Sequence, residues 1–569
     1  MSVAPLLPRP RGLRLGHERV EAREPAQVLG ASLPAQGYRV VIDASAVRID
    51  AADEAGAFYA RATLDQLART HGGRLPVGEI VDWPDVAIRG VMLDISRDKV
   101  PSFSTLAELV DRLASWKLNQ LELYTEHTFA YTGHEEVWEN ASPLGADEVR
   151  ALDALCRERH VELVPNQNCL GHMERWLARD RYRPLAIRPG GFEQWGRHRG
   201  PTTLDPALPG SFELVRGLLG ELAPCFASRR IHVGLDEPFE LPAERAGEYL
   251  DWLARLRALE ALEGREMLVW GDVLATHPEW IGKLPEGVTV CEWGYEADHP
   301  FAERARALAR GGQPFWVCPG TSAWLSILGR TTNMRGNMDA AAAAASEHGA
   351  AGFLITDWGD FGHLQVAPVS DPGLAYGAAI SWCAETNRDL DLAAALDAHA
   401  YFDRAGELGA VLLALGDAHR GSRMQVPNVA ATLLHLWFPE WSLLGAGRPN
   451  GLCEADYRGI EAILDESLAR LARSRPERAD GALVQDELRN ACALVRVLCR
   501  DARARLEADA TLPSIPEATR FELARALEPV IDEHRRLWLA RNREGGLADS
   551  TARLEHLRRC YLTGTTPPP

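Results

Sequence analysis

Short apolar segments alternate with amphipathic segments through the middle of the chain, between about residues 86 and 386. The apolar segments have the length and β-branched content of strands, and eight of them lie at residues 88–96, 120–126, 162–168, 230–236, 267–273, 288–294, 315–321 and 353–359. Helical spacing is found in other stretches, for example at residues 105–116, 147–160, 338–350 and 374–384. Eight strand–helix units predict a parallel sheet closed into a (β/α)8 TIM barrel, and a doubly wound open sheet is the alternative.

Different patterns flank this alternation on both sides. Residues 38–43 and 47–50 resemble paired strands, and residues 54–70 have the spacing of a helix. After the alternation ends, apolar residues recur at helical spacing. We therefore expect an α/β chain with three parts: a small N-terminal α/β domain, the barrel and a C-terminal α-helical region, at residues 1–85, 86–386 and 387–569.

The charge of the chain disfavours some partners. Its 80 acidic and 62 basic residues give a net charge of −18, which argues against nucleic acid and anionic membrane surfaces. No apolar run approaches the ~20 residues of a membrane span, and the apolar part of the N-terminus is short and broken by prolines, so a cytoplasmic protein is expected. The charged faces of the C-terminal helices are expected to be solvated or to form a homo-oligomer interface.

The ten cysteines lack the spacing of a zinc site, and the histidines form no HxH or HxxEH pattern. We therefore expect free thiols, no metal and no other cofactor. No phosphate-binding glycine loop and no GxSxG elbow is found either.

The predicted strands become polar or aromatic at their C-terminal ends, where TIM barrels place their chemistry. The fourth strand, in the stretch IHVGLDEPFE, ends in the adjacent carboxylates Asp236 and Glu237. A solvated pair of surface charges is the alternative interpretation of these two residues. Carboxylates and aromatic rings around a barrel mouth suit a sugar, and the further candidates are Glu126, His172, Trp270, Trp293, Tyr295, Trp324, Trp358 and Asp360, with Arg89 near the start of the first strand.

Four motifs then resemble one family, glycoside hydrolase family 20. HVGLDE at residues 232–237 resembles its HxGxDE motif, and IRGVMLDISRD at residues 88–98 resembles its first barrel strand. CLGH at residues 169–172 resembles its PGH turn, and TDWGD at residues 356–360 resembles its W-x-E element with Asp in place of Glu. The resemblance covers about residues 1–385, because the α/β segment before the barrel also fits.

The resemblance implies substrate-assisted catalysis, in which the 2-acetamido group of the sugar is the nucleophile. Glu237 is then the general acid and base, and Asp236 orients the acetamido N–H. An ionised Asp236 favours the protonated form of Glu237 that a general acid needs. The resemblance also implies that substrate contacts come from Arg89 as a donor to sugar hydroxyls, from Asp360 as an acceptor, from Trp270, Trp293 and Trp358 as walls, and from His172 and Glu126 as supporting groups.

One departure from the family concerns the acetamido oxygen. Members usually carry a Tyr after the seventh strand that donates to this oxygen, whereas the segment CPGTSAW at residues 318–324 contains none. Tyr295 is the first candidate for this role, ahead of Tyr124 and Trp324.

The resemblance thus implies an exo-acting β-N-acetylhexosaminidase whose partner is an amino-sugar glycan with terminal GlcNAc or GalNAc. A metal-dependent barrel hydrolase and a non-catalytic glycan-binding barrel are the alternatives.

Overall fold

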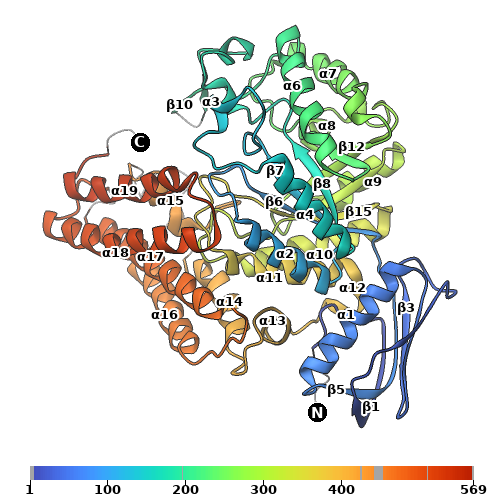
Figure 1. The fold of residues 1–569 in the computed structure, drawn as a ribbon. Coiled ribbons are helices and arrows are strands. Elements are labelled where there is room, and N and C mark those ends of the chain that lie inside the picture. Colours follow the sequence, from blue (N-terminus) through green and yellow to red (C-terminus); the bar gives the residue numbers. More distant parts are fainter. Residues whose placement is uncertain are drawn as a thin grey trace.

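A computed structural model of the chain describes residues 5–194, 197–422, 424, 426–440, 453–508 and 511–566. It has an N-terminal sheet, a central barrel and a group of C-terminal helices that lies beside the barrel (Figure 1). Among the helices in these ranges, none combines the length and apolarity that a membrane span requires.

The N-terminal domain is a five-stranded sheet with one helix on it. The strands are β1 (Gly12–Glu21), β2 (Ala26–Leu29), β3 (Tyr38–Ile42), β4 (Val47–Ala51) and β5 (Arg74–Asp82), in the order β1-β5-β3-β4-β2. Helix α1 (Glu54–Thr70) begins at Asp53, whose side chain accepts a hydrogen bond from the backbone N–H of Gly56. The predicted strands at 38–43 and 47–50 and the predicted helix are therefore confirmed. Strands β1, β2 and β5 were not predicted. Of these, β1 and β2 are largely exposed and carry little apolar alternation.

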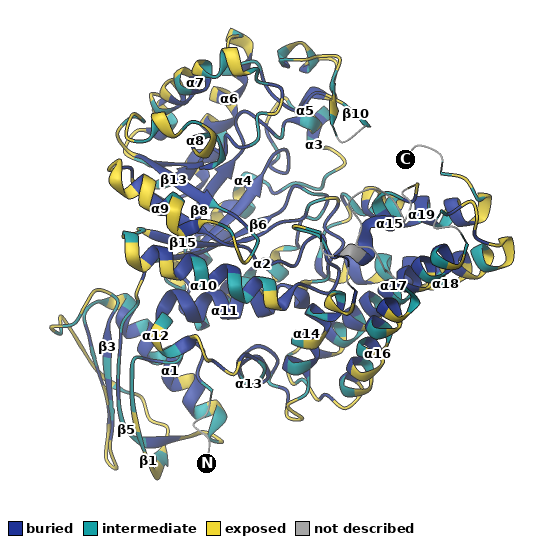
Figure 2. Cartoon of the chain, turned by 180° about the vertical axis from the view of Figure 1, so that it is seen from behind, coloured by how far each residue is buried: buried dark blue, intermediate teal, exposed yellow. Residues whose placement is uncertain are grey.

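The predicted barrel is confirmed as a closed ring of eight strands in the order β11-β12-β13-β14-β15-β6-β7-β8. Their bounds are β6 (Ile88–Asp94), β7 (Gln120–Thr125), β8 (Glu162–Gln167), β11 (Arg230–His232), β12 (Glu266–Trp270), β13 (Val288–Trp293), β14 (Phe315–Cys318) and β15 (Gly352–Asp357). In Figure 2 the barrel strands are mostly dark blue, and yellow is concentrated on the outer helices and loops.

Helices cover the outside of the barrel. The longer ones are α2 (Phe103–Ser115), α4 (Ala146–Glu158), α6 (Pro209–Leu222), α7 (Gly247–Arg257), α9 (Phe301–Arg310), α10 (Thr331–His348) and α11 (Asp371–Trp382). Apolar side chains between these helices and the strands form the largest core of the protein. A separate cluster fills the barrel interior, and it includes Met92, Tyr124, Val164, Leu268, Trp270, Trp316 and Trp358.

The C-terminal region is helical, as predicted. Its longer helices are α14 (Leu408–Gly416), α16 (Glu454–Leu471), α17 (Gly481–Glu507), α18 (Glu517–Arg541) and α19 (Leu547–Thr563).

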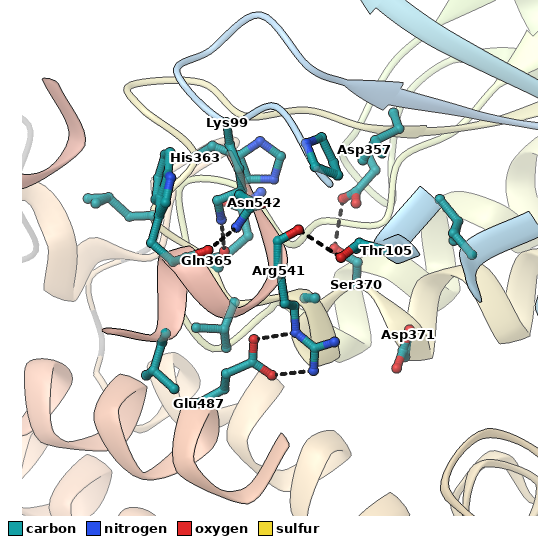
Figure 3. Close-up of a pocket in the computed structure, with 18 of the residues that line it drawn as sticks. Lys99, Thr105, Asp357, His363, Gln365, Ser370, Asp371, Glu487, Arg541 and Asn542 are labelled. Carbon is teal, nitrogen blue, oxygen red and sulfur yellow. Dashed lines mark hydrogen bonds and ion pairs between the residues drawn. The ribbon is translucent and has the colours of Figure 1, made fainter. Parts of the chain in front are cut away.

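The end of α18 fixes these helices to the barrel. The guanidinium of Arg541 donates to both carboxylate oxygens of Glu487 on α17, at 2.6 and 2.7 Å (Figure 3). Its carbonyl oxygen accepts from the hydroxyl of Thr105 on α2 at 2.7 Å. A cavity of about 110 Å³ lies at this junction.

Candidate active site

The two adjacent carboxylates lie on a sharply bent loop after β11. This strand ends at His232, not at residue 236 as predicted, because Gly234 and Leu235 have left-handed φ values of 69° and 71°. Glu237 also has a positive φ of 46°. The bend sends the two side chains in different directions, so the Asp236 side chain is 7% exposed while the Glu237 side chain is 35% exposed.

Asp236 is surrounded by donors. Its Oδ1 accepts from Nδ2 of Asn168 at 2.7 Å, and its Oδ2 lies 3.2 Å from Nε2 of His172. Burial alone would raise the pKa of Asp236, but the positive charge and hydrogen bond of His172 outweigh it and lower that pKa. Asp236 is therefore an ionised acceptor at neutral pH.

His172 joins the two carboxylates, because its Nε2 also lies 3.5 Å from Oε2 of Glu237. Although burial opposes its charge, Asp236 and Glu237 together hold the pKa of His172 well above its usual value. The preceding Gly171 permits this contact. A Cβ atom at that position would lie 2.4 Å from the carbonyl oxygen of Asp236, so only glycine lets the two loops approach.

The side chain of Asp272 accepts a hydrogen bond from the backbone of Glu237. Asp272 begins α8 (Asp272–Thr276), and its Oδ2 accepts from the backbone N–H of Glu237 at 3.0 Å. Its Oδ1 lies 3.4 Å from the indole nitrogen of Trp293. Two effects raise the pKa of Asp272 to about 7: burial, which is the larger, and the negative charge of Asp236.

Arg97, in the loop after β6, is a second charged centre of the mouth. Its guanidinium lies 3.1 Å from Asp94, 3.3 Å from Glu126 and 3.3 Å from Nδ1 of His172. It also lies over the rings of Tyr124 and Trp358, at 4.8 and 5.1 Å from their centroids. The arginine thus links carboxylates from two strands, and its positive charge lowers the pKa of the neighbouring His172, against the effect of Asp236 and Glu237.

The predicted acid Glu126 lies in this network. The hydroxyl of Tyr124 donates to it at 3.0 Å, and burial raises its pKa to about 7 in spite of the charge of Arg97. Asp360 lies on the same side and is half-buried. Burial raises the pKa of Asp360 to about 6, with Arg97 acting in the opposite direction.

Four of the predicted aromatic residues meet beside these charges. The indole N–H of Trp358 donates to the hydroxyl oxygen of Tyr295 at 2.7 Å. The ring of Tyr295 stacks on Trp293 at 5.2 Å and meets Trp324 edge-on at 4.9 Å. Trp293 and Tyr295 are half-buried, whereas Trp324 is 1% exposed and lies behind them.

Trp270 forms the floor of this aromatic group. Its ring lies 5.7 Å from that of Trp358 and 4.3 Å from that of His232, and its side chain is fully buried. The structure therefore places Trp270 beneath the mouth.

Arg89 is the one predicted site residue that the structure places elsewhere, and the prediction of a sugar contact for it is wrong. It lies near the start of β6, at the opposite end of the barrel from the mouth. Its guanidinium donates to the carbonyl oxygens of Lys117 and Val86 and to the side chain of Gln36, at 2.7 to 3.0 Å. Fully buried with its donors in use, Arg89 fastens the barrel to the N-terminal domain.

Residues outside the predicted set complete the site, chiefly Arg97, Asn168 and Asp272. Each follows a barrel strand, so its position at a strand end is the signal that could have identified it. Among the described residues, no group of three His, Cys, Asp or Glu side chains is arranged to hold a metal ion.

Two family models match this chain. One, described as glycosyl hydrolase family 20, domain 2, matches residues 7–83, and the other, described as the catalytic domain of that family, matches residues 87–351. The second range includes the loop with Asp236 and Glu237 and ends before Trp358.

The chain is similar to curated proteins over part of its length. A beta-hexosaminidase of Vibrio furnissii is 28% identical over 238 residues, which are 35% of this chain and 37% of that protein. A lacto-N-biosidase of Bifidobacterium bifidum is 24% identical over 212 residues, which are 36% of this chain and 18% of that protein. The chain thus matches well under half of the length of either relative.

Solved structures share the fold. A GH20 exo beta-N-acetylglucosaminidase from Vibrio harveyi in complex with N-acetylglucosamine superposes with a TM-score of 0.57 at 19% identity. The superposition covers 73% of this chain and 78% of that chain. A Streptomyces plicatus N-acetyl-beta-hexosaminidase superposes with a TM-score of 0.53 at 21% identity, over 66% of this chain and 83% of that chain.

Proposed function

Because this chain belongs to glycoside hydrolase family 20, we propose that it is an exo-acting β-N-acetylhexosaminidase that removes terminal β-linked GlcNAc or GalNAc with retention of configuration. The observation that carries the proposal is the different setting of two adjacent carboxylates. Asp236 is buried and bonded to His172 and Asn168, whereas Glu237 is open to the mouth.

This arrangement favours a nucleophile supplied by the substrate. Two enzyme carboxylates that act as acid and nucleophile must flank the sugar about 5 Å apart. Asp236 and Glu237 are instead neighbours in the chain that both contact one atom of His172. A buried, ionised Asp236 suits an acceptor for the acetamido N–H, which becomes more acidic as the acetamido oxygen attacks the anomeric carbon.

The proposed reaction proceeds in two steps. Glu237 protonates the glycosidic oxygen while the acetamido oxygen bonds to the anomeric carbon and the leaving group departs. Glu237 then takes a proton from water, which attacks the same carbon and opens the cyclised intermediate. Asp236 holds the acetamido N–H in both steps and stabilises the positive charge that develops on that group.

Other residues of the mouth would position the sugar. We assign Arg97 in place of Arg89 as the donor to sugar hydroxyls, and Asp360 as an acceptor on the same side. Tyr295 is proposed as the donor to the acetamido oxygen, because its hydroxyl oxygen accepts from Trp358 and a phenol also carries a proton to donate. Trp293 and Trp358 would then face the apolar parts of the ring and the acetamido methyl.

The variant Glu237→Gln tests the proposal, with an aryl N-acetyl-β-glucosaminide as substrate. It is expected to lose turnover by at least ~10³-fold while its circular dichroism and melting temperature stay unchanged. Asp236→Asn is expected to impair acetamido substrates similarly, and a thiazoline mimic of the cyclised intermediate should inhibit the wild type. Glu244→Gln, at an exposed carboxylate seven residues further along, is the matched control and should retain full activity.

Other outcomes would support the alternatives. Loss of turnover on chelation, with restoration by a divalent cation, would indicate a metal-dependent hydrolase. Glycan binding without turnover in the wild type would indicate a non-catalytic barrel. Undiminished activity in Glu237→Gln would contradict the assignment itself.

A further inference from the structure

Residues 426–440 of the C-terminal region, here named the rim segment, follow the edge of the barrel mouth. The backbone N–H of Asn428 donates to Glu296, after β13, at 2.6 Å. The N–H of Ala430 donates to the carbonyl of Leu325, after β14, at 2.9 Å. The segment contains α15 (Leu434–Trp437), which lies on the barrel side of α19 (Figures 1 and 2). These contacts place part of the C-terminal region directly beside the proposed catalytic site.

The far end of the rim segment meets two more loops of the mouth. Glu440 forms an ion pair with Arg197 of β10 (Arg197–Arg199), in the long connection that follows β8. The same guanidinium lies over the ring of Phe438, 4.6 Å from its centroid. Trp437 meets Phe361 from the loop after β15. The rim segment therefore contacts the loops after four different barrel strands.

Phe361, Trp437 and Phe438 form a small aromatic shelf on this rim. The ring centroids of Phe361 and Trp437 are 5.6 Å apart with an interplanar angle of 39°, and those of Phe361 and Phe438 are 6.4 Å apart. Trp437 is half-buried and packs against the aromatic cluster of the barrel interior. Phe361 lies on these two rings with 41% of its surface exposed.

The backbone at Phe361 is unusual for an exposed apolar residue. Its φ is 57°, a left-handed conformation that is rare and strained for a bulky side chain. Single exposed apolar residues are common on protein surfaces and need no function. Phe361 differs because it is held in an unfavourable conformation beside a catalytic mouth, where strain is often retained for function.

The position of the shelf indicates which part of a substrate it would meet. Phe361 directly follows Asp360, whose carboxyl responds electrostatically to Arg97 and to Glu237. Trp358, three residues earlier, belongs to the aromatic cluster of the barrel interior and would contact the terminal sugar. Phe361 is 41% exposed whereas Trp358 is 6% exposed, so the ring of Phe361 lies on the solvent side of the same loop, where a leaving group would extend.

We propose that Phe361, supported by Trp437 and Phe438, is a stacking platform for the first sugar ring on the leaving-group side of the scissile bond. The apolar C–H face of a pyranose packs flat against an exposed aromatic ring. The preferred substrates are therefore glycans in which the terminal amino sugar is linked to another sugar ring. This inference rests on the function proposed above, and it assigns a part of the substrate site to the C-terminal region.

The test compares two substrates that differ only in the leaving group: a disaccharide with terminal β-GlcNAc on a second GlcNAc, and methyl β-GlcNAc. For Phe361→Leu and Trp437→Leu, the ratio of kcat/KM for the disaccharide to kcat/KM for the methyl glycoside should fall about 5- to 10-fold, mainly through the KM of the disaccharide. Phe361→Tyr keeps an aromatic ring and should restore the ratio. Phe521→Leu, at an exposed ring on α18, is the control that should leave both values unchanged.

An unchanged ratio in folded Phe361→Leu would overturn the platform while leaving the proposed function intact. If the wild type hydrolyses neither substrate, the proposed function fails instead. The platform is then tested by disaccharide binding, followed by tryptophan fluorescence. Equal disaccharide affinity of the wild type and Phe361→Leu would overturn the platform. An affinity at least fivefold weaker in the variant would support it.

Discussion

Nε2 of His172 lies 3.2 Å from Oδ2 of Asp236, and the two side chains are 13% and 7% exposed. A pair so little exposed interacts through a weaker dielectric screen than a surface ion pair, so each partner controls the charge of the other. The pKa of Asp236 is lowered and that of His172 is raised, although burial acts on both groups in the opposite direction. His172 therefore keeps Asp236 ionised in the proposed mechanism.

Replacing His172 by Gln should shift the acidic limb of the pH profile. Without the histidine charge, burial dominates and the pKa of Asp236 rises, so Asp236 takes up a proton at a higher pH. We expect the acidic limb of kcat/KM to move to higher pH and activity at pH 7 to fall on the order of 10²-fold. Measuring kcat/KM from pH 3 to 8 tests this.

The partly exposed pair of His277 and Glu279, at 3.1 Å, provides the control for this measurement. His277→Gln removes a similar contact away from the mouth and should leave the profile unchanged. An acidic limb at the same pH in wild type and His172→Gln would contradict the role of the histidine.

Replacement by lysine should lower activity at Arg97, in the loop after β6, and should lower stability at Arg89, near the start of β6. Arg97→Lys keeps a charge at the mouth but loses the planar fork that reaches Asp94 and Glu126 at once, so kcat/KM should fall on the order of 10²-fold. Arg89→Lys, at the opposite end, leaves carbonyl acceptors without donors and should lower the free energy of unfolding by about 2 kcal/mol.

Steady-state kinetics and urea unfolding of both variants test this pair, because each variant is the control for the other. Arg89→Lys should retain its kcat/KM, because its side chain is remote from the mouth. A large loss of kcat/KM in stable Arg89→Lys would restore the original interpretation of that residue as a substrate contact.

The wrong prediction for Arg89 shows which features of the site local sequence patterns can predict. Strand periodicity and strand–helix alternation predicted the barrel, because its strands and helices are each stabilised by short-range patterns. Asp236, His172 and Trp358 could be placed because each lies at a predicted strand end or in the following loop. Arg89 lies in the same strand as Asp94, but at its start, and strand direction alone already places a strand's start away from the mouth of a parallel barrel.

Other features depended on packing between distant segments. The contact of Trp437 with Phe361 joins two residues 76 positions apart, and no motif connects the rim segment with the barrel. The early end of β11 likewise follows from left-handed residues whose conformation the apolar pattern does not reveal. Such contacts require the three-dimensional structure, because the residues that make them have no regular spacing in the sequence.

Tyr295→Phe should lower the catalytic rate and leave the stability of the fold nearly unchanged. The hydroxyl oxygen of Tyr295 accepts from Trp358, and burial raises the pKa of the phenol well above its usual value, so the group keeps its proton as a donor. Loss of one donor to the proposed acetamido oxygen should lower kcat on the order of 10²-fold with a small effect on melting temperature.

Tyr249→Phe is the matched control, because this buried hydroxyl on α7 has no hydrogen-bond partner among the described residues. It should leave kcat unchanged. If Tyr295→Phe also keeps its full kcat, the acetamido oxygen must be held by another group, with Tyr124 and Trp324 the next to test.

Asp272 should make the protein less stable as the pH rises. Its pKa is raised to about 7 in the folded chain by burial and by Asp236, compared with about 3.9 for an unfolded Asp. Below pH 4 the carboxyl is protonated in both states. As the pH rises towards 7 the unfolded chain releases this proton first, so the folded state progressively loses the stability that this group contributed.

The variant Asp272→Asn should remove this dependence, because an amide does not titrate and its oxygen can still accept from the N–H of Glu237. Between pH 4.5 and 8, the free energy of unfolding of the wild type should therefore fall by about 3 kcal/mol more than that of Asp272→Asn. Urea unfolding of both proteins across this range measures the difference. Asp298→Asn removes an exposed carboxyl and should follow the wild type. Parallel curves for wild type and Asp272→Asn would show that Asp272 has an ordinary pKa, raised neither by burial nor by Asp236.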